Sequence, residues 1–204
     1  MTYMSTSTLR HFLVRVLQRI ITYCYRFIGI LEPAIDYSSD GLYRTELKLF
    51  LQTFFPGIRG KRVLDLGTGQ WGWTKQSIGE LCDVTTFDVR DGEHVDVVGN
   101  VYELLHFFEE NTFDYVFATD VFEHLLDIPR ALNGVRSVLK RGGTLIISTP
   151  FNKELHGEEY GDYWRVTRQG WDVLLRQNGF ERKRMQWVGQ EIFPKAYLLD
   201  AQKV

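Results

Sequence analysis

The chain has 204 residues, 44% of them hydrophobic and 25% charged. These values are typical of globular proteins and disfavour a disordered chain, a collagen-like repeat and a coiled-coil rod. The 24 basic and 26 acidic residues leave a net charge of −2, which disfavours nucleic acid as a partner because nothing attracts a phosphate backbone. The two cysteines, Cys24 and Cys82, show no metal-ligand spacing and are expected to be reduced thiols.

The N-terminal segment, residues 9–31, is apolar but interrupted by arginines. On a helix, Arg15, Arg19, Thr22 and Arg26 would share one face, with apolar side chains around the rest. No uncharged run reaches the roughly 18 residues that a spanning helix needs, so a transmembrane helix or signal peptide is disfavoured. We predict an amphipathic helix that packs on the following domain or on a second copy of the chain as a homodimer, or else makes peripheral contact with an anionic membrane.

A loop separates this helix from the rest of the chain. Pro33 and the polar residues 36–41 end it, and the apolar spacing that follows predicts a second helix at about 42–55, acting as a lid or a docking helix. We therefore expect N-terminal helices in residues 1–57 and one domain in residues 58–204.

The domain starts with the pattern strand, tight turn, helix. Residues 62–66 (RVLDL) are an apolar run, residues 67–72 (GTGQWG) are rich in glycine, and residues 73–81 can form a helix. Glycine permits a positive φ and a close approach of the backbone to a ligand, and the free N–H groups at a helix start favour an anionic group. This pattern is typical of a nucleotide-binding turn.

An acidic residue follows the next predicted strand. Asp88 comes after residues 84–87, where its carboxylate can accept hydrogen bonds from both hydroxyls of a ribose. The glycines also fit the GxGxxG pattern of dinucleotide-binding folds, which leaves a nicotinamide cofactor open. Asp65, at the end of the first strand, would repel a pyrophosphate but suits the ammonium of an amino acid. Together these residues favour S-adenosylmethionine as the cofactor.

The motifs, taken in order, resemble the class I S-adenosylmethionine-dependent methyltransferases, and their type 11 group in particular. VLDLGTGQWG resembles their first motif, residues 95–100 their third strand, residues 113–124 their fourth strand with its EH signature, and residues 138–150 their glycine turn and fifth strand. The resemblance implies an α/β fold: a Rossmann-like seven-stranded, mostly parallel sheet with an antiparallel last strand and helices on both faces.

The resemblance also implies the cofactor site. Asp88 matches the acid that holds the ribose, Asn100 matches the residue that reads the adenine amino group, and Glu123 is expected to help form the pocket. The full set of implied cofactor-binding residues is Asp65, Gly67, Thr68, Gly69, Asp88, Asn100, Asp120, Val121 and Glu123.

The chain departs from the family pattern between the second and third strands. Only eleven residues separate Asp88 from Asn100, too few for the usual helix, and residues 89–94 are polar. We expect that helix to be missing or reduced to a turn, with the adenine side of the pocket open or covered by the N-terminal helices. The last two strands are expected at about 182–188 and 196–202.

The loop after the fifth strand is the expected site of the methyl acceptor, because ligands of open α/β sheets bind at the carboxyl ends of the strands. Residues 151–167 resemble a stretch of small bacterial methyltransferases associated with surface-glycan or secondary-metabolite synthesis. Tyr163, Trp164 and Arg165 would contact the substrate, although Trp164 and Arg165 could instead hold the loop in place. Thr167 would cap the helix that follows.

Methyl transfer to a hydroxyl needs the acceptor in line with the methyl group and a base for its proton. His156, in the crevice loop near Asp162, is the first candidate because imidazole titrates near neutral pH. His124 is the second candidate, and it could equally shape or cap the turn after the fourth strand.

Motifs that the sequence lacks narrow the substrate. We find no Asp/Asn-Pro-Pro-aromatic motif of amino-directed nucleic-acid enzymes, no nucleophilic cysteine of a cytosine-C5 enzyme and no carboxylate cluster of a magnesium-dependent catechol enzyme, so neither nucleic acid nor a metal is expected. We predict O-methylation of a small molecule or of a glycan or secondary-metabolite precursor, with nitrogen and carbon acceptors open. The alternatives are an NAD-dependent oxidoreductase and a non-catalytic, methyltransferase-like docking subunit. The expected location is cytoplasmic, with peripheral contact to the membrane as the variant.

Overall fold

The computed structural model describes residues 13, 16, 17, 19, 20, 23, 24, 39–69, 72–157 and 159–204. The chain forms two compact units, Met1–Glu46 and Leu47–Val204, whose boundary falls within helix α2 (Ser39–Gln52). The described residues between 13 and 24 are helical, and the remainder of the predicted helix at 9–31 lies outside the described residues. Among the described residues, no helix combines the length and the apolar character needed to cross a membrane.

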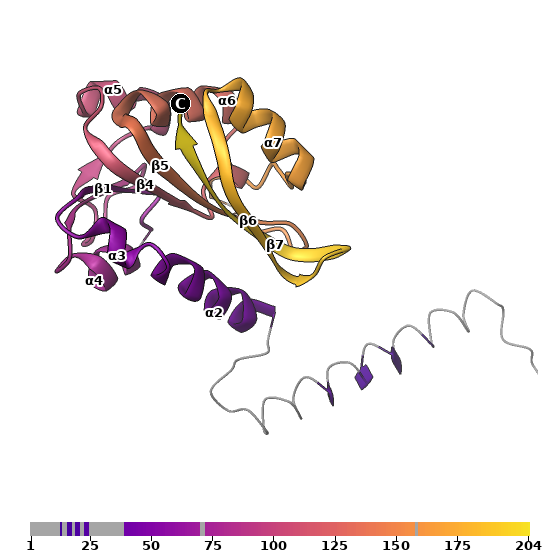
Figure 1. Cartoon of the computed structure of the whole chain (residues 1–204). Coiled ribbons are helices and arrows are strands. Elements are labelled where there is room, and N and C mark those ends of the chain that lie inside the picture. Colours follow the sequence, from indigo (N-terminus) through magenta and orange to yellow (C-terminus); the bar gives the residue numbers. More distant parts are fainter. Residues whose placement is uncertain are drawn as a thin grey trace, which may run out of the picture. The chain divides into compact units, whose positions relative to one another are not determined.

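The second unit is built on a sheet whose described residues form seven strands. In chain order these are β1 (Arg62–Leu66), β2 (Asp83–Asp88), β3 (Val97–Val98), β4 (Phe113–Thr119), β5 (Leu139–Pro150), β6 (Phe180–Gln190) and β7 (Phe193–Lys203). Across the sheet the order is β3-β2-β1-β4-β5-β7-β6. The pairs among β1 to β5 are parallel, whereas β7 runs antiparallel to both β5 and β6 (Figure 1). The predicted α/β fold with an antiparallel last strand is confirmed.

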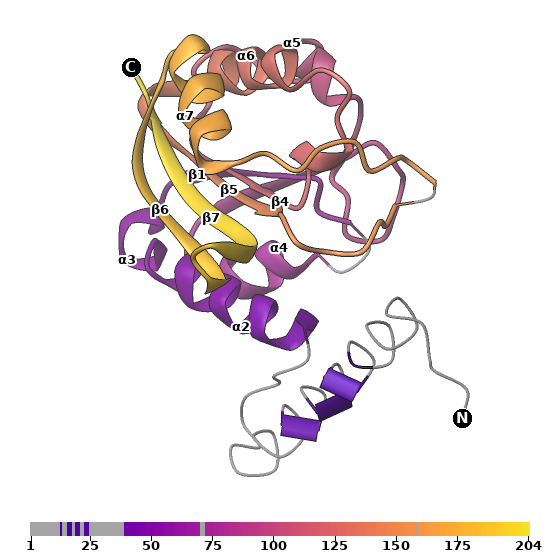
Figure 2. The same cartoon turned by 90° about the vertical axis from the view of Figure 1, so that its right-hand side faces the viewer.

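Helices cover both faces of this sheet (Figure 1, Figure 2). On one face lie α5 (Leu104–Phe107), α6 (Ile128–Val138) and α7 (Arg168–Gln177), and on the other lie α3 (Phe55–Ile58) and α4 (Trp73–Ile78). Two short 3-10 helices, η1 (Val101–Glu103) and η2 (Phe122–His124), follow β3 and β4. The central strands are covered by helices on both faces. Their sequences are accordingly mostly apolar along the strand, without a regular alternation of apolar and polar residues.

The segment after β4 packs in the hydrophobic core together with buried residues of α6 and α7. α6 has apolar residues three or four positions apart, and all of them are buried: Ile128, Ala131, Leu132, Val135 and Val138. Phe122 of η2 is fully buried and meets Trp171 of α7 edge to face, with ring centroids 5.5 Å apart. η2 is therefore anchored in the core, which fixes the residues that follow Phe122.

The start of α7 is set by its cap, as predicted. The Thr167 hydroxyl accepts a hydrogen bond from the backbone N–H of Gly170 at 3.1 Å. Gly179, just after the helix, has φ +75°, a conformation that favours glycine. The loop between β5 and α7 thus ends at a defined point of the fold.

The helix that usually joins the second and third strands is absent from this chain, as predicted, since residues 89–96 contain no helix. Asp96 holds this connection to β2 in its place. Its carboxylate accepts hydrogen bonds from the backbone N–H of Thr86 at 3.0 Å and from Lys75 Nζ at 2.5 Å. The short connection is therefore fixed by polar contacts instead of helix packing.

Several element boundaries differ from those expected. The helix after the glycine turn ends at Ile78 instead of residue 81, because glycine, a poor helix former, follows it. β3 has two residues where four were expected, and α2 begins and ends about three residues earlier than the predicted 42–55. β6 and β7 are longer than expected because they form one hairpin, whose pairing continues to Gln190 and Phe193.

Candidate functional site

A cavity of about 400 Å³ lies at the carboxyl ends of β1, β2 and β4, where open α/β sheets bind their ligands. Eight of the residues predicted for the site line it: Gly67, Gly69, Asp88, Asn100, Asp120, Val121, His124 and Tyr163. The others do not line it: Asp65, Thr68, Glu123, His156, Trp164 and Arg165. The residues predicted for the site thus include residues that line this cavity and residues that do not.

The glycine turn after β1 forms one wall of the cavity. Gly67 has φ +74°, and a Cβ built there would lie 2.5 Å from Cγ2 of Val121. Gly69 has φ +61°, but a Cβ there would meet no heavy atom within 4 Å. Gly67 is therefore required both by backbone conformation and by close packing on Val121, whereas Gly69 leaves open space at the wall.

Asp88 stands at the end of β2, facing the turn. Its Oδ2 accepts a hydrogen bond from the backbone N–H of Gly69 at 3.0 Å, and its Oδ1 accepts one from the backbone N–H of Arg90 at 2.9 Å. Each carboxylate oxygen has two lone-pair sites, so each keeps the capacity to accept from a ligand hydroxyl. The Asp88 side chain is buried from bulk solvent, and it forms part of the cavity lining.

Asn100 lies between β3 and η1 and also lines the cavity. Its Oδ1 accepts a hydrogen bond from the backbone N–H of Tyr102 at 3.0 Å, which makes it the N-cap of η1. Because a backbone N–H only donates, this contact fixes which end of the amide is the oxygen. The amide NH2 group remains as a donor at the cavity wall.

Asp65 lies behind the wall, in the middle of the sheet. It is 2% exposed, and this burial raises its pKa to about 6, with the charge of Asp88 adding to the rise. Thr68, in the turn itself, is a second predicted residue outside the lining, and its hydroxyl is buried beside the Asp65 carboxyl. Neither residue contributes to the cavity wall.

The end of β4 makes a strained turn at Asp120. This residue has φ +54°, which is uncommon for a side chain other than glycine. Ser148 of β5 holds it there: its hydroxyl donates to Asp120 Oδ1 at 2.9 Å, and its carbonyl accepts from the Asp120 N–H at 3.1 Å. The turn places Val121 against Gly67 and starts η2 at the cavity.

The loop after β5 lies on η2 and is held there by hydrogen bonds to the backbone carbonyls of Glu123 and Leu125. The N–H of Tyr163 donates to the carbonyl of Glu123 at 2.7 Å, and Nε1 of Trp164 donates to the carbonyl of Leu125 at 2.8 Å. Arg165 Nη2 donates to Asp162 Oδ2 at 2.7 Å. Tyr163 therefore reaches the cavity, whereas the indole N–H of Trp164 is engaged by the end of η2 and the guanidinium of Arg165 by the loop itself.

Two residues that the sequence analysis did not single out close the same side of the cavity. The Arg90 guanidinium lies 4.7 Å from the ring centroid of Tyr160, and the Tyr160 ring meets the His124 ring at 4.7 Å. Both line the cavity. The available signal was position alone: Arg90 follows Asp88 by two residues, and Tyr160 lies in the predicted crevice loop.

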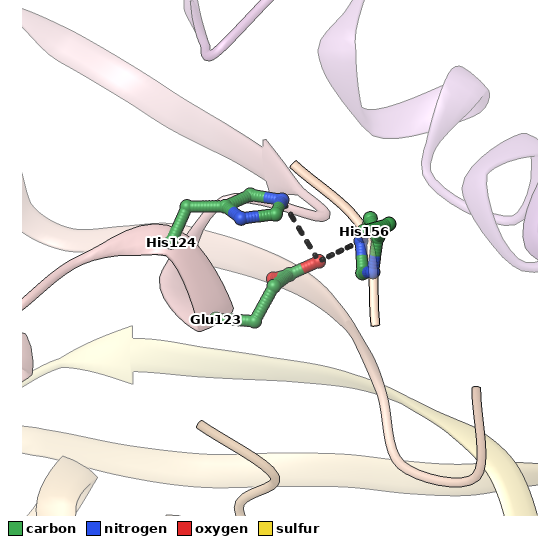
Figure 3. Close-up of side chains that lie close together, drawn as sticks. All are labelled: Glu123, His124 and His156. Carbon is green, nitrogen blue, oxygen red and sulfur yellow. Dashed lines mark ion pairs between the residues drawn. The ribbon is translucent and has the colours of Figure 1, made fainter. Parts of the chain in front are cut away.

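Glu123, His124 and His156 come together beside the cavity (Figure 3). Oε1 of Glu123 lies 3.7 Å from Nε2 of His124 and 3.8 Å from Nε2 of His156. Glu123 is 1% exposed, and neither of its carboxylate oxygens has a hydrogen-bond partner. Burial raises the pKa of Glu123 well above its usual range and lowers the pKa of His124. The sequence analysis named all three residues but not their meeting.

Comparison with known proteins places this geometry in a family. Residues 40–194 match the model of a family described as "Methyltransferase domain" (Methyltransf_23). Phosphoethanolamine N-methyltransferase 2 of Caenorhabditis elegans is 26% identical over 142 residues, which cover 63% of this chain and 31% of that protein. The chain thus spans about a third of the length of this curated relative.

Solved structures share the fold at low sequence identity. The 1,6-didemethyltoxoflavin-N1-methyltransferase of Burkholderia thailandensis, solved with 1,6-didemethyltoxoflavin and S-adenosylhomocysteine, has a TM-score of 0.62 at 19% identity and covers 100% of this chain and 93% of its own. An S-adenosylmethionine-dependent methyltransferase of Mesorhizobium loti has a TM-score of 0.58 at 16% identity, with coverage of 75% and 95%. The [4+2]-cyclase SpnF has a TM-score of 0.57 at 17% identity, with coverage of 72% and 75%.

Proposed function

The chain belongs to the class I S-adenosylmethionine-dependent methyltransferases, with S-adenosylmethionine as its cofactor, and we propose that it methylates an oxygen atom of a small molecule or of a glycan or secondary-metabolite precursor. The observation that carries the proposal is the cavity itself. Its lining combines the acid and the glycine turn, which we assign to the cofactor end, with His124 and Tyr163, which we assign to the acceptor end. The family identity argues against the NAD-dependent oxidoreductase alternative.

The residues present at the first end fit the cofactor. The two Asp88 oxygens keep lone pairs for the ribose hydroxyls, and the open wall at Gly69 leaves room for the ligand to approach the backbone. The amide of Asn100 keeps a donor NH2 group at the wall and an oxygen that can accept a second hydrogen bond, as recognition of adenine requires. When bound, the cofactor supplies a methyl group activated by its sulfonium.

The acceptor would enter at the second end. His124, Tyr160 and Tyr163 line that end, and the loop that carries the tyrosines is fixed on η2 by backbone hydrogen bonds. Aromatic rings with polar atoms suit a hydroxylated ring or a sugar, because such rings combine apolar contact with hydrogen bonding. Tyr163 is the residue that we propose to contact the acceptor, with Trp164 and Arg165 holding the loop.

Loss of the hydroxyl proton is the step that this end must support. His124 lines the cavity, and burial lowers its pKa, which favours the neutral imidazole that can take up a proton at neutral pH. His156 lies farther back, with its ring 4.9 Å from that of His124. We therefore place His124 nearer to the acceptor than His156, the reverse of the order inferred from the sequence.

A nitrogen acceptor is the second candidate. Phosphoethanolamine N-methyltransferase 2 and the toxoflavin enzyme both carry N-methylation in their names. An amine nucleophile would need the same end of the cavity and a base of the same kind. An acceptor screen should therefore contain amines as well as hydroxylated compounds.

Calorimetric titration with S-adenosylmethionine, S-adenosylhomocysteine and NAD tests the cofactor first. We expect micromolar binding of the first two ligands and none of NAD. The purified chain is then incubated with S-adenosylmethionine and a panel of sugars, phenols and amines, with release of S-adenosylhomocysteine as the readout. Turnover with a hydroxylated compound supports the proposal. Cofactor binding without turnover on any acceptor would favour the non-catalytic docking subunit instead.

A further inference from the structure

We propose that Glu123, His124 and His156 form a binding site for one divalent transition-metal ion beside the cavity. Their ligand atoms, Oε1 of Glu123 and one ring nitrogen of each histidine, all lie within 4.8 Å of one another. The site does not depend on the proposed methyl transfer, because metal binding can be measured without cofactor or acceptor.

The contacts of Nδ1 in each histidine show that Nε2 is the ring nitrogen that faces the site. Nδ1 of His124 lies at hydrogen-bond distance from the carbonyl of Gly161, and a carbonyl only accepts, so Nδ1 carries the proton. Nδ1 of His156 lies 3.1 Å from Asp162 Oδ2 and 3.3 Å from the carbonyl of Glu154. A neutral His124 ring held in this way presents an unprotonated Nε2 to Glu123, and the His156 ring directs its own Nε2 at the same carboxylate oxygen. Metal-binding histidines are commonly oriented by such a carbonyl or carboxylate on the other nitrogen.

The three groups face one another without a hydrogen bond to the Glu123 oxygens. In their unprotonated forms both Nε2 atoms and the Glu123 carboxylate are acceptors, and Figure 3 shows both rings directed at the same carboxylate oxygen. Glu123 is 1% exposed, and no hydrogen bond reaches either of its oxygens. A buried carboxylate without a partner is unfavourable, and a cation between the three acceptor atoms would compensate its charge.

The distances fit a metal once the ligand atoms close on it. Bonds of about 2.0–2.1 Å from a tetrahedral zinc ion to nitrogen and oxygen ligands place the ligand atoms about 3.3 Å apart. The Glu123 oxygen lies 3.7 and 3.8 Å from the two Nε2 atoms, a few tenths of an ångström beyond this distance, and the three ligand atoms together span up to 4.8 Å, so binding an ion requires the two rings to move toward each other. Two imidazoles and one carboxylate suit a first-row transition metal such as Zn²⁺ better than Mg²⁺, which prefers oxygen ligands.

Such an ion would have a chemical consequence at the cavity, which it would border through His124. Three protein ligands leave a coordination position open, and a hydroxyl bound there is acidified. Its proton would pass to solvent, the oxygen would form a bond to the methyl carbon, and the carbon–sulfur bond would break with its electron pair left on sulfur. The metal would then replace an imidazole as the means of activating the acceptor.

The test measures metal content of the full chain prepared without a histidine tag. The protein is stripped with a chelator, equilibrated with zinc chloride or magnesium chloride, desalted and analysed by plasma mass spectrometry. We expect about one zinc ion per chain and no retained magnesium. Glu123→Gln and His156→Ala should each weaken zinc binding by about 10-fold or more, whereas the matched control His106→Ala, at an exposed histidine outside the cluster, should retain the ion.

Cobalt absorption gives a second readout, since the ligand-field spectrum of Co²⁺ reports its ligands. A spectrum that forms in the wild-type chain and is lost in His156→Ala supports the site, provided that circular dichroism of the metal-free variant matches wild type. No zinc retention by the wild-type chain, or equal retention by Glu123→Gln, would overturn the inference whether or not the variants fold. Titration with S-adenosylhomocysteine in parallel separates this failure from failure of the proposed function.

Discussion

The backbone N–H of Gly69 donates to the carboxylate of Asp88 at 3.0 Å, linking the glycine turn after β1 to the end of β2. This contact joins the two sequence features that first suggested a nucleotide. The N–H of Arg90 donates to the other carboxylate oxygen, so the two hydrogen bonds together fix the orientation of the Asp88 side chain. The turn and the acid therefore act as one preformed element of the cavity.

Asp88→Asn should weaken S-adenosylhomocysteine binding by about 10- to 100-fold. The amide keeps the size of the side chain but loses one of the two oxygen acceptors, and hydrogen bonds to a charged group contribute about 1.5–3 kcal/mol. Calorimetric titration measures the change. Asp83→Asn, at the exposed beginning of the same strand, is the matched control and should bind as wild type does. An Asp88→Asn chain with affinity within twofold of wild type would refute the assignment.

Gly67→Ala should harm the cofactor site, whereas Gly60→Ala should only lower stability. Both glycines have a positive φ, so each alanine is strained by about 1–2 kcal/mol. Only at Gly67 does the new Cβ also collide with Val121, a residue of the cavity wall. We expect at least a tenfold loss of S-adenosylhomocysteine affinity for Gly67→Ala and none for Gly60→Ala, by calorimetry alongside urea unfolding. Equal affinities would show that packing on Val121 is not needed.

Asp65→Asn should stabilise the ligand-free chain above pH 6. The folded-state pKa of about 6 exceeds the ordinary aspartate pKa of 3.8, so the folded state holds this proton more tightly than the unfolded state. The contribution of Asp65 to the free energy of unfolding therefore falls as pH rises from about 4 to about 6, by about 3 kcal/mol in total. Asparagine does not titrate, so the stability difference between variant and wild type should grow over this interval. Urea unfolding at pH 4 and pH 7.5 measures it, and equal differences at both values would contradict the burial argument.

Arg165→Ala should loosen the loop between β5 and α7. Arg165 is the ionic partner of the almost fully buried Asp162 side chain, and loss of hydrogen bonds to a charged group costs about 1.5–3 kcal/mol. We expect faster proteolytic cleavage within residues 152–167 and a lower melting temperature. Arg168→Ala is the matched control, because its 4.0 Å contact with Glu191 is exposed and such pairs contribute little. Unchanged cleavage in Arg165→Ala would assign the loop's order to its backbone contacts alone.

The features predicted well from the sequence are those set by neighbouring residues. The glycine turn, the acid after β2 and the Thr167 cap each depend on local backbone requirements, and counting residues between Asp88 and Asn100 was enough to exclude a helix. Fold class followed because these local patterns occur in a fixed order along the chain.

The features that the sequence did not predict depend on contacts between distant segments. His156 reaches Glu123 because the loop is laid on η2 by the backbone N–H groups of Tyr163 and Trp164 and by the indole N–H of Trp164, and these bonds join segments about 40 residues apart in the chain. Trp164 and Arg165 lie outside the cavity lining, as in the alternative in which they hold the loop in place, but the sequence left both roles open. Spacing alone could not distinguish a residue in the cavity wall from one directly behind it.

The position of β7 in the sheet bears on how the chain reaches its folded state during synthesis. β7 lies between β5 and β6, although both precede it in the sequence. Until residues 193–203 leave the ribosome, the edge of β5 has no partner, and β6 has no strand to join to the sheet. From the synthesis of β5 until the emergence of β7, the nascent chain therefore carries an open sheet edge, and over this interval edge-to-edge association competes with folding. The edge of β5 is closed only when the strand that follows β6 arrives.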